Sequence, residues 1–245
     1  MIYYIYDGSF DGLLTCIYEA YYRREKPEKI LFREDDQENL LVQKVYIEQD
    51  KEKAEKVYTA IRTKISLNAL QNVFYTFLSE DEDAGSLIYR YIQLGFKVGK
   101  DIDGHLSDER VLDLHKVVQR VTKEKHLMLG LVRFRKVGDN LYYAPITPDN
   151  QILGLLAPHF SKRMADQNWI IYDTRRNMAA IYDQKEWILM EMVLERSLEV
   201  GEEELFYQQL WQQYFKSIAI KNRMNPKLQK QHMPKRYWKN LVEKI

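Results

Sequence analysis

The chain has 245 residues, of which 45% are hydrophobic, and a formal net charge of +1, which together predict a globular protein with one or two packed domains. Its longest apolar runs fall far below the roughly 18–20 residues that cross a bilayer, and residues 1–7 lack a secretory leader, so we expect a cytoplasmic protein without membrane contact. The single cysteine, Cys16, excludes an internal disulfide and cannot supply the thiolates of an iron–sulfur cluster.

A strand, a turn and a helix are predicted at the start of the chain. Residues 2–6 are apolar and β-rich, and residues 7–9 supply a turn in which Ser9 can cap a helix. Further along, residues 40–47 predict a second strand, and apolar residues at helical spacing predict helices over 50–65 and 67–78. This region is therefore expected to mix helices with strands.

A domain boundary is predicted at residue 82. Ser79 followed by Glu82 has the form of a capping box, which marks the start of a helix. An apolar face with helical spacing follows over 87–94. We therefore predict an N-terminal α/β region over 1–82 and a C-terminal α+β domain over 83–245.

The C-terminal region is predicted to begin with a helix and a hairpin. Ser107, followed by two acidic residues, can cap a helix whose apolar residues repeat at helical spacing from Val111. Residues 129–135 and 140–146 have strand composition on either side of a Gly-Asp turn. Those two strands are expected to pair.

A second strand pair and further helices are predicted after the hairpin. Residues 152–164 have helical spacing, although Pro158 would kink or split that helix. Residues 169–172 and 178–182 predict another strand pair, and helices are expected to dominate from Glu186 onward. The predicted fold class is α+β, helix-rich with short antiparallel strand pairs.

Some reactive and aromatic side chains are assigned to the core. Cys16 stands among leucine and isoleucine on an apolar helix, where a buried thiol is inert. Trp211, Tyr214 and Phe215 occur at helical spacing with leucines and are predicted to be core residues. Neither set is expected to carry chemistry.

No metal site is predicted. The five histidines show neither a metalloprotease helix motif nor paired ligand spacing. There is also no cysteine pair to complete a zinc site. We therefore expect no cofactor to be held by this chain.

His159 and its neighbours in sequence suggest a catalytic hypothesis. Histidine transfers protons near neutral pH, Asp173 could orient it, and Arg163 or Arg176 could hold a phosphate. In the alternative interpretation, His159 packs beneath its helix and Asp173 pairs with Arg176 across the turn, as structural ion pairs commonly do. The spacing by itself does not bring these groups together.

Positive charge is concentrated at the end of the chain. Residues 216–245 carry +8, whereas the preceding 215 residues carry −7. Residues 225–239 interleave cations, amides and aromatic rings, which are the residue types that contact phosphates and stack on unpaired bases. In the alternative, Tyr237, Trp238 and Leu241 anchor a terminal helix while the lysines remain solvated.

The order of local patterns resembles a bacterial family that is provisionally named for DNA metabolism and has no established activity. The patterns are Tyr6-Asp7-Gly8-Ser9-Phe10-Asp11-Gly12-Leu13-Leu14, Gly130-Leu131-Val132-Arg133-Phe134, Pro158-His159-Phe160 with Arg163, Trp169-Ile170-Ile171-Tyr172-Asp173 with Arg176, and residues 225–238. The resemblance covers nearly the whole chain.

The resemblance implies a protein partner. Members of that family look like neighbours of a radical-SAM protein described as a DNA modification or repair enzyme, and their C-terminal part also occurs fused to uracil-DNA-glycosylase-like domains. This chain lacks the three-cysteine motif of a radical-SAM enzyme and shows no glycosylase motif. It therefore resembles the companion, and the iron–sulfur cluster and SAM are expected only in the partner.

Three functions are compatible with these patterns. The first is a nucleic-acid-binding accessory protein in DNA repair or modification, acting with the radical-SAM partner on single-stranded or damaged DNA. The second is an enzyme, hydrolase or glycosylase-like, acting on DNA or a nucleotide through His159 and Asp173. The third is a protein-interaction scaffold. The residues expected at a nucleic acid are Arg133, Arg163, Arg176, Lys227, Lys230, Lys235, Arg236, Tyr237 and Trp238.

Overall fold

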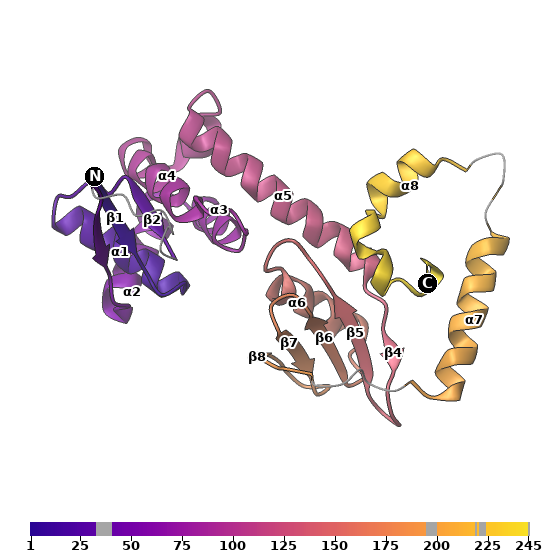
Figure 1. The fold of residues 1–245 in the computed structure, drawn as a ribbon. Helices are drawn as coiled ribbons and strands as arrows, with labels where there is room; N and C mark the ends of the chain where they lie inside the picture. The colour runs from indigo at the N-terminus through magenta and orange to yellow at the C-terminus, as the bar shows by residue number, and fades with distance from the viewer. Residues whose placement is uncertain (33–40, 195–199, 219, 221–223, 245) are drawn as a thin grey trace. The chain divides into compact units, whose positions relative to one another are not determined.

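The structure is a computed structural model that describes residues 1–32, 41–194, 200–218, 220 and 224–244 (Figure 1). The chain forms two compact units, Met1–Thr122 and Lys123–Ile245, which divide inside helix α5 (Glu109–Leu131). Each unit has its own small sheet and its own helices. The predicted α+β class is confirmed. The domain boundary was predicted at residue 82, just before helix α4 (Ala84–Val98). The two units divide later in the chain, after Thr122.

The sheet of the first unit is parallel. Its strands, in spatial order, are β2 (Lys29–Leu31), β1 (Ile2–Ile5) and β3 (Gln43–Tyr46). Helix α1 (Phe10–Tyr22) connects β1 to β2, because parallel strands need a crossover connection. The strands predicted over 2–6 and 40–47 are present in shortened form, and Leu40 lies outside the described residues. The short strand β2 was not predicted.

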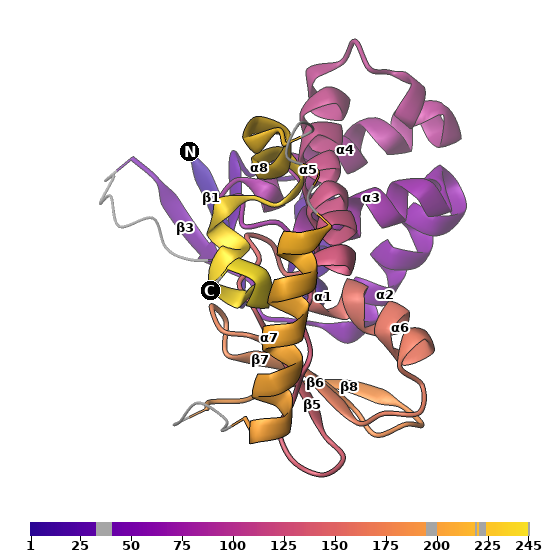
Figure 2. The ribbon, with the colours of Figure 1, turned by 90° about the vertical axis from the view of Figure 1, so that its right-hand side faces the viewer.

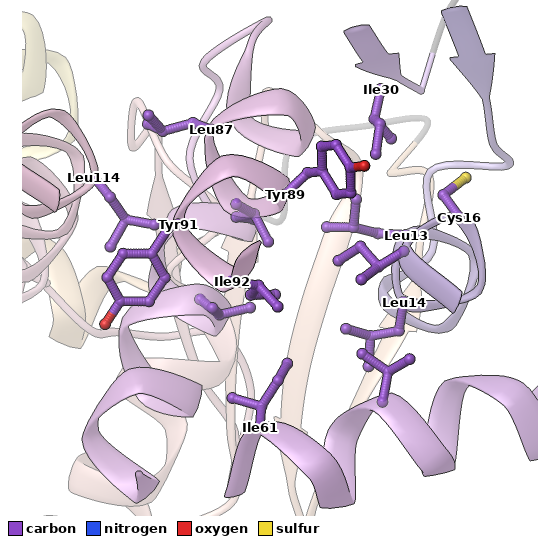
Figure 3. Close-up of a cluster of buried hydrophobic side chains, with 14 of the residues drawn as sticks. Leu13, Leu14, Cys16, Ile30, Ile61, Leu87, Tyr89, Tyr91, Ile92 and Leu114 are labelled. Atoms are coloured by element: carbon purple, nitrogen blue, oxygen red, sulfur yellow. The ribbon is translucent and has the colours of Figure 1, made fainter. Parts of the chain in front are cut away.

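Helix α1 begins as predicted. Ser9 Oγ accepts a hydrogen bond from the Gly12 amide at 2.9 Å, and Asp7 Oδ1 accepts one from the Ser9 hydroxyl at 2.7 Å. A Cβ at position 12 would lie 2.1 Å from Asp7 Oδ1, so a larger residue there would displace the Asp7 side chain from its hydrogen bond with Ser9. The cap starts the helix so that Leu13 and Leu14 point into the core, as Figure 3 shows.

The core of the first unit joins buried residues of β1, β2 and α1 to those of six further helical segments. They are α2 (Lys51–Ala60), the π-helical turn η1 (Ile61–Ile65), α3 (Leu67–Phe77), α4, the 3₁₀ turn η2 (Gly99–Gly104) and α5. Ile61 and Ile92 are almost fully buried there (Figure 3). Helix α4 packs very close to β2, since a Cβ on Gly85 would lie 2.4 Å from the carbonyl oxygen of Ile30. The helices predicted over 50–65 and 67–78 are therefore observed, the first one ending in the π-helical turn.

Two predicted helix caps are wrong. Ser79 does not start α4, which begins at Ala84, because the Ser79 hydroxyl donates instead to the Thr76 carbonyl at 2.7 Å. At the start of α5, Asp108 Oδ1 accepts a hydrogen bond from the Arg110 backbone amide at 3.0 Å. A carboxylate one residue farther along the chain thus replaces the predicted cap at Ser107.

The sheet of the second unit is mixed. Its spatial order is β4 (Arg135–Lys136), β5 (Tyr142–Ile146), β6 (Trp169–Asp173), β7 (Met178–Tyr182) and β8 (Trp187–Glu191). The pair β5–β6 is parallel and the other three pairs are antiparallel. Helix α6 (Leu153–Arg163) makes the parallel crossover and packs on the sheet through residues such as Phe160.

Several predictions for this unit need correction. The strand predicted over 129–135 is wrong, because α5 continues to Leu131 and only the two-residue strand β4 follows. Strand β8 lies where helices were expected to dominate. The helix predicted over 152–164 is observed as α6, and Pro158, which was expected to kink or split it, does not split it.

The end of the chain consists of helices and short turns. They are α7 (Glu202–Ser217), α8 (Pro226–His232), and the 3₁₀ turns η4 (Lys235–Asn240) and η5 (Val242–Lys244). Helix α7 lies beside η5 (Figures 1 and 2), and Gln212 Nε2 donates to the Val242 carbonyl at 2.9 Å. Among the described residues, no helix is long and apolar enough to cross a membrane.

Candidate nucleic-acid interface

A pocket of about 350 Å³ lies in the second unit, between the end of α5, helices α7 and α8, and the turn η5. We call it the C-terminal pocket. Its lining combines aromatic, cationic and apolar side chains, which are His126, Leu127, Gly130, Leu131, Arg133, Trp211, Phe215, His232, Met233 and Glu243. The pocket thus joins residues that are more than 100 positions apart in the sequence.

A buried ion pair forms one wall of the C-terminal pocket. Arg133 contacts both carboxylate oxygens of Glu243, at 3.1 Å from Nε and 2.6 Å from Nη2, and Trp211 Nε1 donates to the same carboxylate at 3.1 Å. Burial alone would raise the pKa of Glu243, but the hydrogen bonds from Arg133 and Trp211 hold the pKa below its ordinary value. Glu243 is therefore a fixed anion, and Arg133 is largely neutralised by it.

Cations lie over aromatic rings around this pocket. Lys244 Nζ is 5.0 Å from the centroid of the Phe215 ring and 4.7 Å from that of Trp238, and Arg133 lies 5.8 Å from the Trp211 ring. The Trp238 indole is held in place by a 2.8 Å hydrogen bond from Nε1 to the Met233 carbonyl. Rings and cations in this arrangement suit the stacking of a base beside a phosphate.

Trp211, Tyr214 and Phe215 were predicted to be core residues, and this prediction is wrong. No residue of α7 is buried, and Trp211 and Tyr214 are 41% and 53% exposed. Trp211 and Phe215 line the C-terminal pocket instead. The helical spacing was interpreted correctly, but among the described residues the main packing partner of α7 is the short turn η5, which leaves its apolar side chains unburied.

Helix α8 presents two of the predicted lysines to solvent. Asn225 caps the helix by accepting the Leu228 amide at 3.0 Å, and Pro226 occupies the first turn, where its missing N–H costs nothing. Lys227, Lys230 and, beyond the helix, Lys235 are exposed. Within the described part of the chain, none of these lysines forms an ion pair with a carboxylate. They are available to a polyanion.

Arg236 and Tyr237 are engaged within the protein. Arg236 Nε lies 2.9 Å from Asp149 Oδ2. Tyr237 is buried, and its hydroxyl donates to the buried carboxylate of Glu124, so that burial and this hydrogen bond raise its pKa. A base has no access to the Tyr237 ring, which leaves Trp238, half-buried, as the aromatic residue of the predicted pair that can contact one.

Glu124 is the centre of a hydrogen-bond network that sequence reasoning missed. Its carboxylate accepts the backbone amides of Asp149 at 2.7 Å and Asn150 at 2.8 Å, the Asn150 side-chain amide at 2.6 Å, and the Tyr237 hydroxyl. Its spacing was an available signal. Glu124 follows buried Val121 by three residues and precedes buried Met128 by four, and therefore continues a buried helical stripe.

His159 and Asp173 have different surroundings in the structure. Asp173 is 1% exposed and its Oδ2 pairs with Arg176 Nη1 at 2.7 Å, while Arg176 Nη2 donates to the Asp149 carbonyl at 2.7 Å. His159 and Arg163 are exposed on α6, and the His159 ring packs edge-on against Phe160. Among the described residues, no hydrogen bond or ion pair joins His159 to Asp173. The Asp173–Arg176 pair therefore has the geometry expected in the alternative interpretation, in which these two residues form a structural ion pair across the turn.

The first unit contains a polar cluster that was also missed. Asp103 accepts hydrogen bonds from the Tyr91 hydroxyl at 2.6 Å and from the side-chain amides of Asn68 at 2.6 Å and Asn72 at 3.1 Å, and its carboxylate lies 2.9 Å from His115 Nε2. Burial alone would raise the pKa of Asp103, but these partners lower it. The cluster ties η2 to three helices. Across the described ranges, no group of three His, Cys, Asp or Glu side chains could hold a metal ion.

Residues 82–243, more than half of the chain, match the family model described as a domain of unknown function, DUF4130. The chain belongs to the DUF4130 family. No curated protein matches it. The DUF4130 region includes every residue that lines the C-terminal pocket, together with Glu124, Asp173, α8 and η4. The C-terminal pocket therefore lies within the region that matches the family model, whereas the sheet of the first unit precedes that region.

Proposed function

We propose that this DUF4130 protein is a nucleic-acid-binding accessory protein of DNA repair or modification. The observation that carries the proposal is the C-terminal pocket, which has rings and cations in and around it and takes part of its lining, His232 and Met233, from the basic segment. In this proposal, Lys227, Lys230 and Lys235 contact phosphates, and an unpaired base enters the pocket. Single-stranded or damaged DNA supplies such a base without the cost of opening a stable pair.

The lysines support the phosphate part of the proposal. A lysine held by a carboxylate would have to exchange that partner for a phosphate, and the three lysines have no such partner in the described part of the chain. Each phosphate contact releases counterions, so binding should weaken as salt is added. Exposed Arg163 on α6 is a further candidate, whereas Arg133, Arg176 and Arg236 already have carboxylate partners.

The pocket supports the base-binding part. Phe215 and Trp211 contribute rings from α7, and Lys244 lies over the Phe215 ring. Aromatic stacking is tolerant of base identity, because every base has a π-face. The Arg133–Glu243 pair keeps the pocket wall rigid and prevents the buried carboxylate from repelling phosphate.

The resemblance to the DNA-metabolism family supports the radical-SAM partner. An iron–sulfur cluster and SAM would belong to that partner, because Cys16 is the single cysteine here and is buried. Burial raises the pKa of the Cys16 thiol to about 12, which opposes formation of a metal-binding thiolate. Within the proposal, this chain presents DNA to the partner and the partner performs the chemistry.

Helix α7 supports an interaction with a protein. Several of its exposed apolar side chains repeat at helical spacing away from the C-terminal pocket and form one stripe, which we call the α7 stripe: Tyr207, Leu210, Tyr214 and, at the C-cap, Ile218. Large exposed apolar patches on a protein surface mark interaction sites. In the proposal, the radical-SAM companion covers this stripe.

Removing the lysines of α8 should weaken DNA binding and make it less dependent on salt. For the variant Lys227→Ala/Lys230→Ala, the slope of log affinity against log salt should fall by about 1.4 on single-stranded DNA, because each phosphate contact contributes about 0.7. Fluorescence anisotropy with labelled single-stranded and duplex DNA over a salt series measures both quantities.

A matched control separates the α8 lysines from general charge. Lys123→Ala/Lys185→Ala removes two exposed lysines elsewhere in the second unit and should leave the slope almost unchanged. Phe215→Ala should cost about 1–3 kcal/mol of affinity for single-stranded DNA without changing the slope. Equal slopes for the α8 variant and the wild type would contradict the phosphate assignment.

Charges placed on the α7 stripe should abolish binding to the partner. Leu210→Asp/Tyr214→Asp would bury two carboxylates in the contact, whereas Gln209→Asp adds a charge outside the stripe on the same helix. Co-expression with the radical-SAM protein, followed by co-purification from nuclease-treated lysate, measures the interaction. Retention of the partner by the double variant, or its loss in both variants, would remove the stripe from the proposal.

A further inference from the structure

A second cavity, of about 600 Å³, lies wholly within the first unit. It is formed by the second half of α1 and the turn after it, by α2 with its π-helical extension, and by α4. We call it the tyrosine groove. Its volume falls in the range of pockets that take small molecules and cofactors.

Four cations at the tyrosine groove have no carboxylate partner. Arg24 and Lys26 follow α1, Lys56 is in α2 and Lys64 is in η1. Across the described ranges, no ion pair joins any of the four to a carboxylate, whereas nearby Arg23 and Lys53 both pair with Glu19. The cations that face the groove are thus left unneutralised.

The groove contains one carboxylate, and it is occupied. Among the lining residues, Glu25 is the single acidic side chain, and it accepts the hydroxyl of Tyr4. Four cations against one engaged anion create a site of positive potential. A ligand with two or more negative charges suits it best.

Aromatic rings stand beside these cations. The side chains of Tyr21 and Phe96 are 76% and 43% exposed, although both line the groove. The rings of Tyr18 and Tyr22 stack at 4.2 Å, and Lys56 Nζ lies 5.8 Å from the centre of the Tyr18 ring. Exposed rings next to unpaired cations match a ligand that has both a flat ring and an anionic group.

Two further lining residues fit such a ligand. Gln93 presents an exposed amide, which has donors and an acceptor for the edge of a base. Arg24 has a φ of 55°, at the end of α1, where glycine would adopt this conformation at lower cost. Arg24 thus adopts a left-handed backbone conformation while its side chain lines the groove.

We propose that the tyrosine groove binds a free nucleoside di- or triphosphate. Its base stacks on the exposed tyrosine and phenylalanine rings, and its phosphates contact Arg24, Lys26, Lys56 and Lys64. This site is distinct from the C-terminal pocket in its residues, and its ligand is a small molecule and not a nucleic-acid strand. The proposal goes beyond DNA binding and does not depend on it.

Isothermal titration of the full-length chain with ATP tests the proposal. Wild type should bind ATP with saturation, and Lys56→Glu/Lys64→Glu should weaken binding by at least about tenfold, which corresponds to 1.4 kcal/mol. The matched control Lys51→Glu/Arg62→Glu reverses two exposed cations of α2 and η1 that do not line the groove. That control should change the affinity by less than about twofold, because exposed charges at a distance are screened by salt.

Three outcomes would overturn the proposal. They are an absence of saturable ATP binding by a wild-type chain that is folded by circular dichroism, equal weakening by the groove and control variants, and adenosine binding as tightly as ATP. If ATP does not bind and an oligonucleotide binds to wild type but not to Lys56→Glu/Lys64→Glu, the groove is assigned to a strand and the nucleotide is rejected. Lys227→Ala/Lys230→Ala should leave ATP affinity unchanged, so a failure of the DNA-binding proposal is distinguishable from a failure here.

Discussion

Replacing Glu124 with alanine should lower the free energy of unfolding by about 3 kcal/mol or more. The carboxylate is buried and accepts the amides of Asp149 and Asn150, the Asn150 side chain and the Tyr237 hydroxyl. Without it, several donors remain inside the protein with no acceptor, and each such group costs about 1–3 kcal/mol. Urea denaturation followed by tryptophan fluorescence measures the change.

An exposed carboxylate on the same helix provides the control. Asp113 pairs with Lys116 at 2.9 Å on the surface of α5, so Asp113→Ala should cost less than about 1 kcal/mol. Glu124→Gln keeps the shape and one acceptor oxygen, and its loss of stability should be smaller than that of Glu124→Ala. If Asp113→Ala and Glu124→Ala were equally destabilising, the network around Glu124 would contribute nothing beyond an ordinary surface contact.

Replacing Arg176 with alanine should destabilise the protein by about 3–5 kcal/mol. Asp173 is 1% exposed, and Arg176 is its cation partner at 2.7 Å. The same guanidinium also donates to the carbonyls of Pro148 at 3.2 Å and Asp149 at 2.7 Å. The variant would leave a buried carboxylate without its counter-charge and the loop carbonyls without their donor. Thermal and urea denaturation measure the loss.

A double-mutant cycle isolates the contribution of the ion pair. Arg176→Ala/Asp173→Ala should be less destabilising than the sum of the two single variants, because each single variant leaves an unpaired buried group. His159→Ala, on the exposed face of α6, should change stability by less than about 0.5 kcal/mol. If the two single effects were additive, Asp173 and Arg176 would not stabilise the fold as a pair. The structural explanation of Asp173 would then be rejected.

The elements predicted correctly are those with a strong local signal. Helix α1 begins after Ser9 because the cap, the turn and the apolar face all agree within a few residues. Strands β6 and β7 flank a tight turn and are antiparallel, as predicted from their composition. The errors occur where the local signal is ambiguous. Residues 129–131 are apolar enough for a strand, but the 23-residue helix α5 extends through them.

The candidate interface was only partly accessible to sequence reasoning. Concentrated charge correctly drew attention to residues 225–239, and the structure leaves Lys227 and Lys230 exposed. The same reasoning could not separate Trp238 from Tyr237, although the two are adjacent, because 3₁₀ geometry turns one ring toward Glu124 and the other toward the pocket side. Arg133 was selected as a phosphate contact, and its buried partner Glu243 was not foreseen.

The sequence by itself determined the α+β class, the capped helix after the first strand and the position of the basic segment. It also showed that this chain has too few cysteines to bind an iron–sulfur cluster. These depend on residues within one or two helical turns of one another, or on composition alone. Only the tertiary structure decided which cations are neutralised, which rings are exposed and which side chains share a cavity. Those properties depend on pairs such as Arg133 with Glu243, more than 100 residues apart in the chain, and no local pattern encodes the partner.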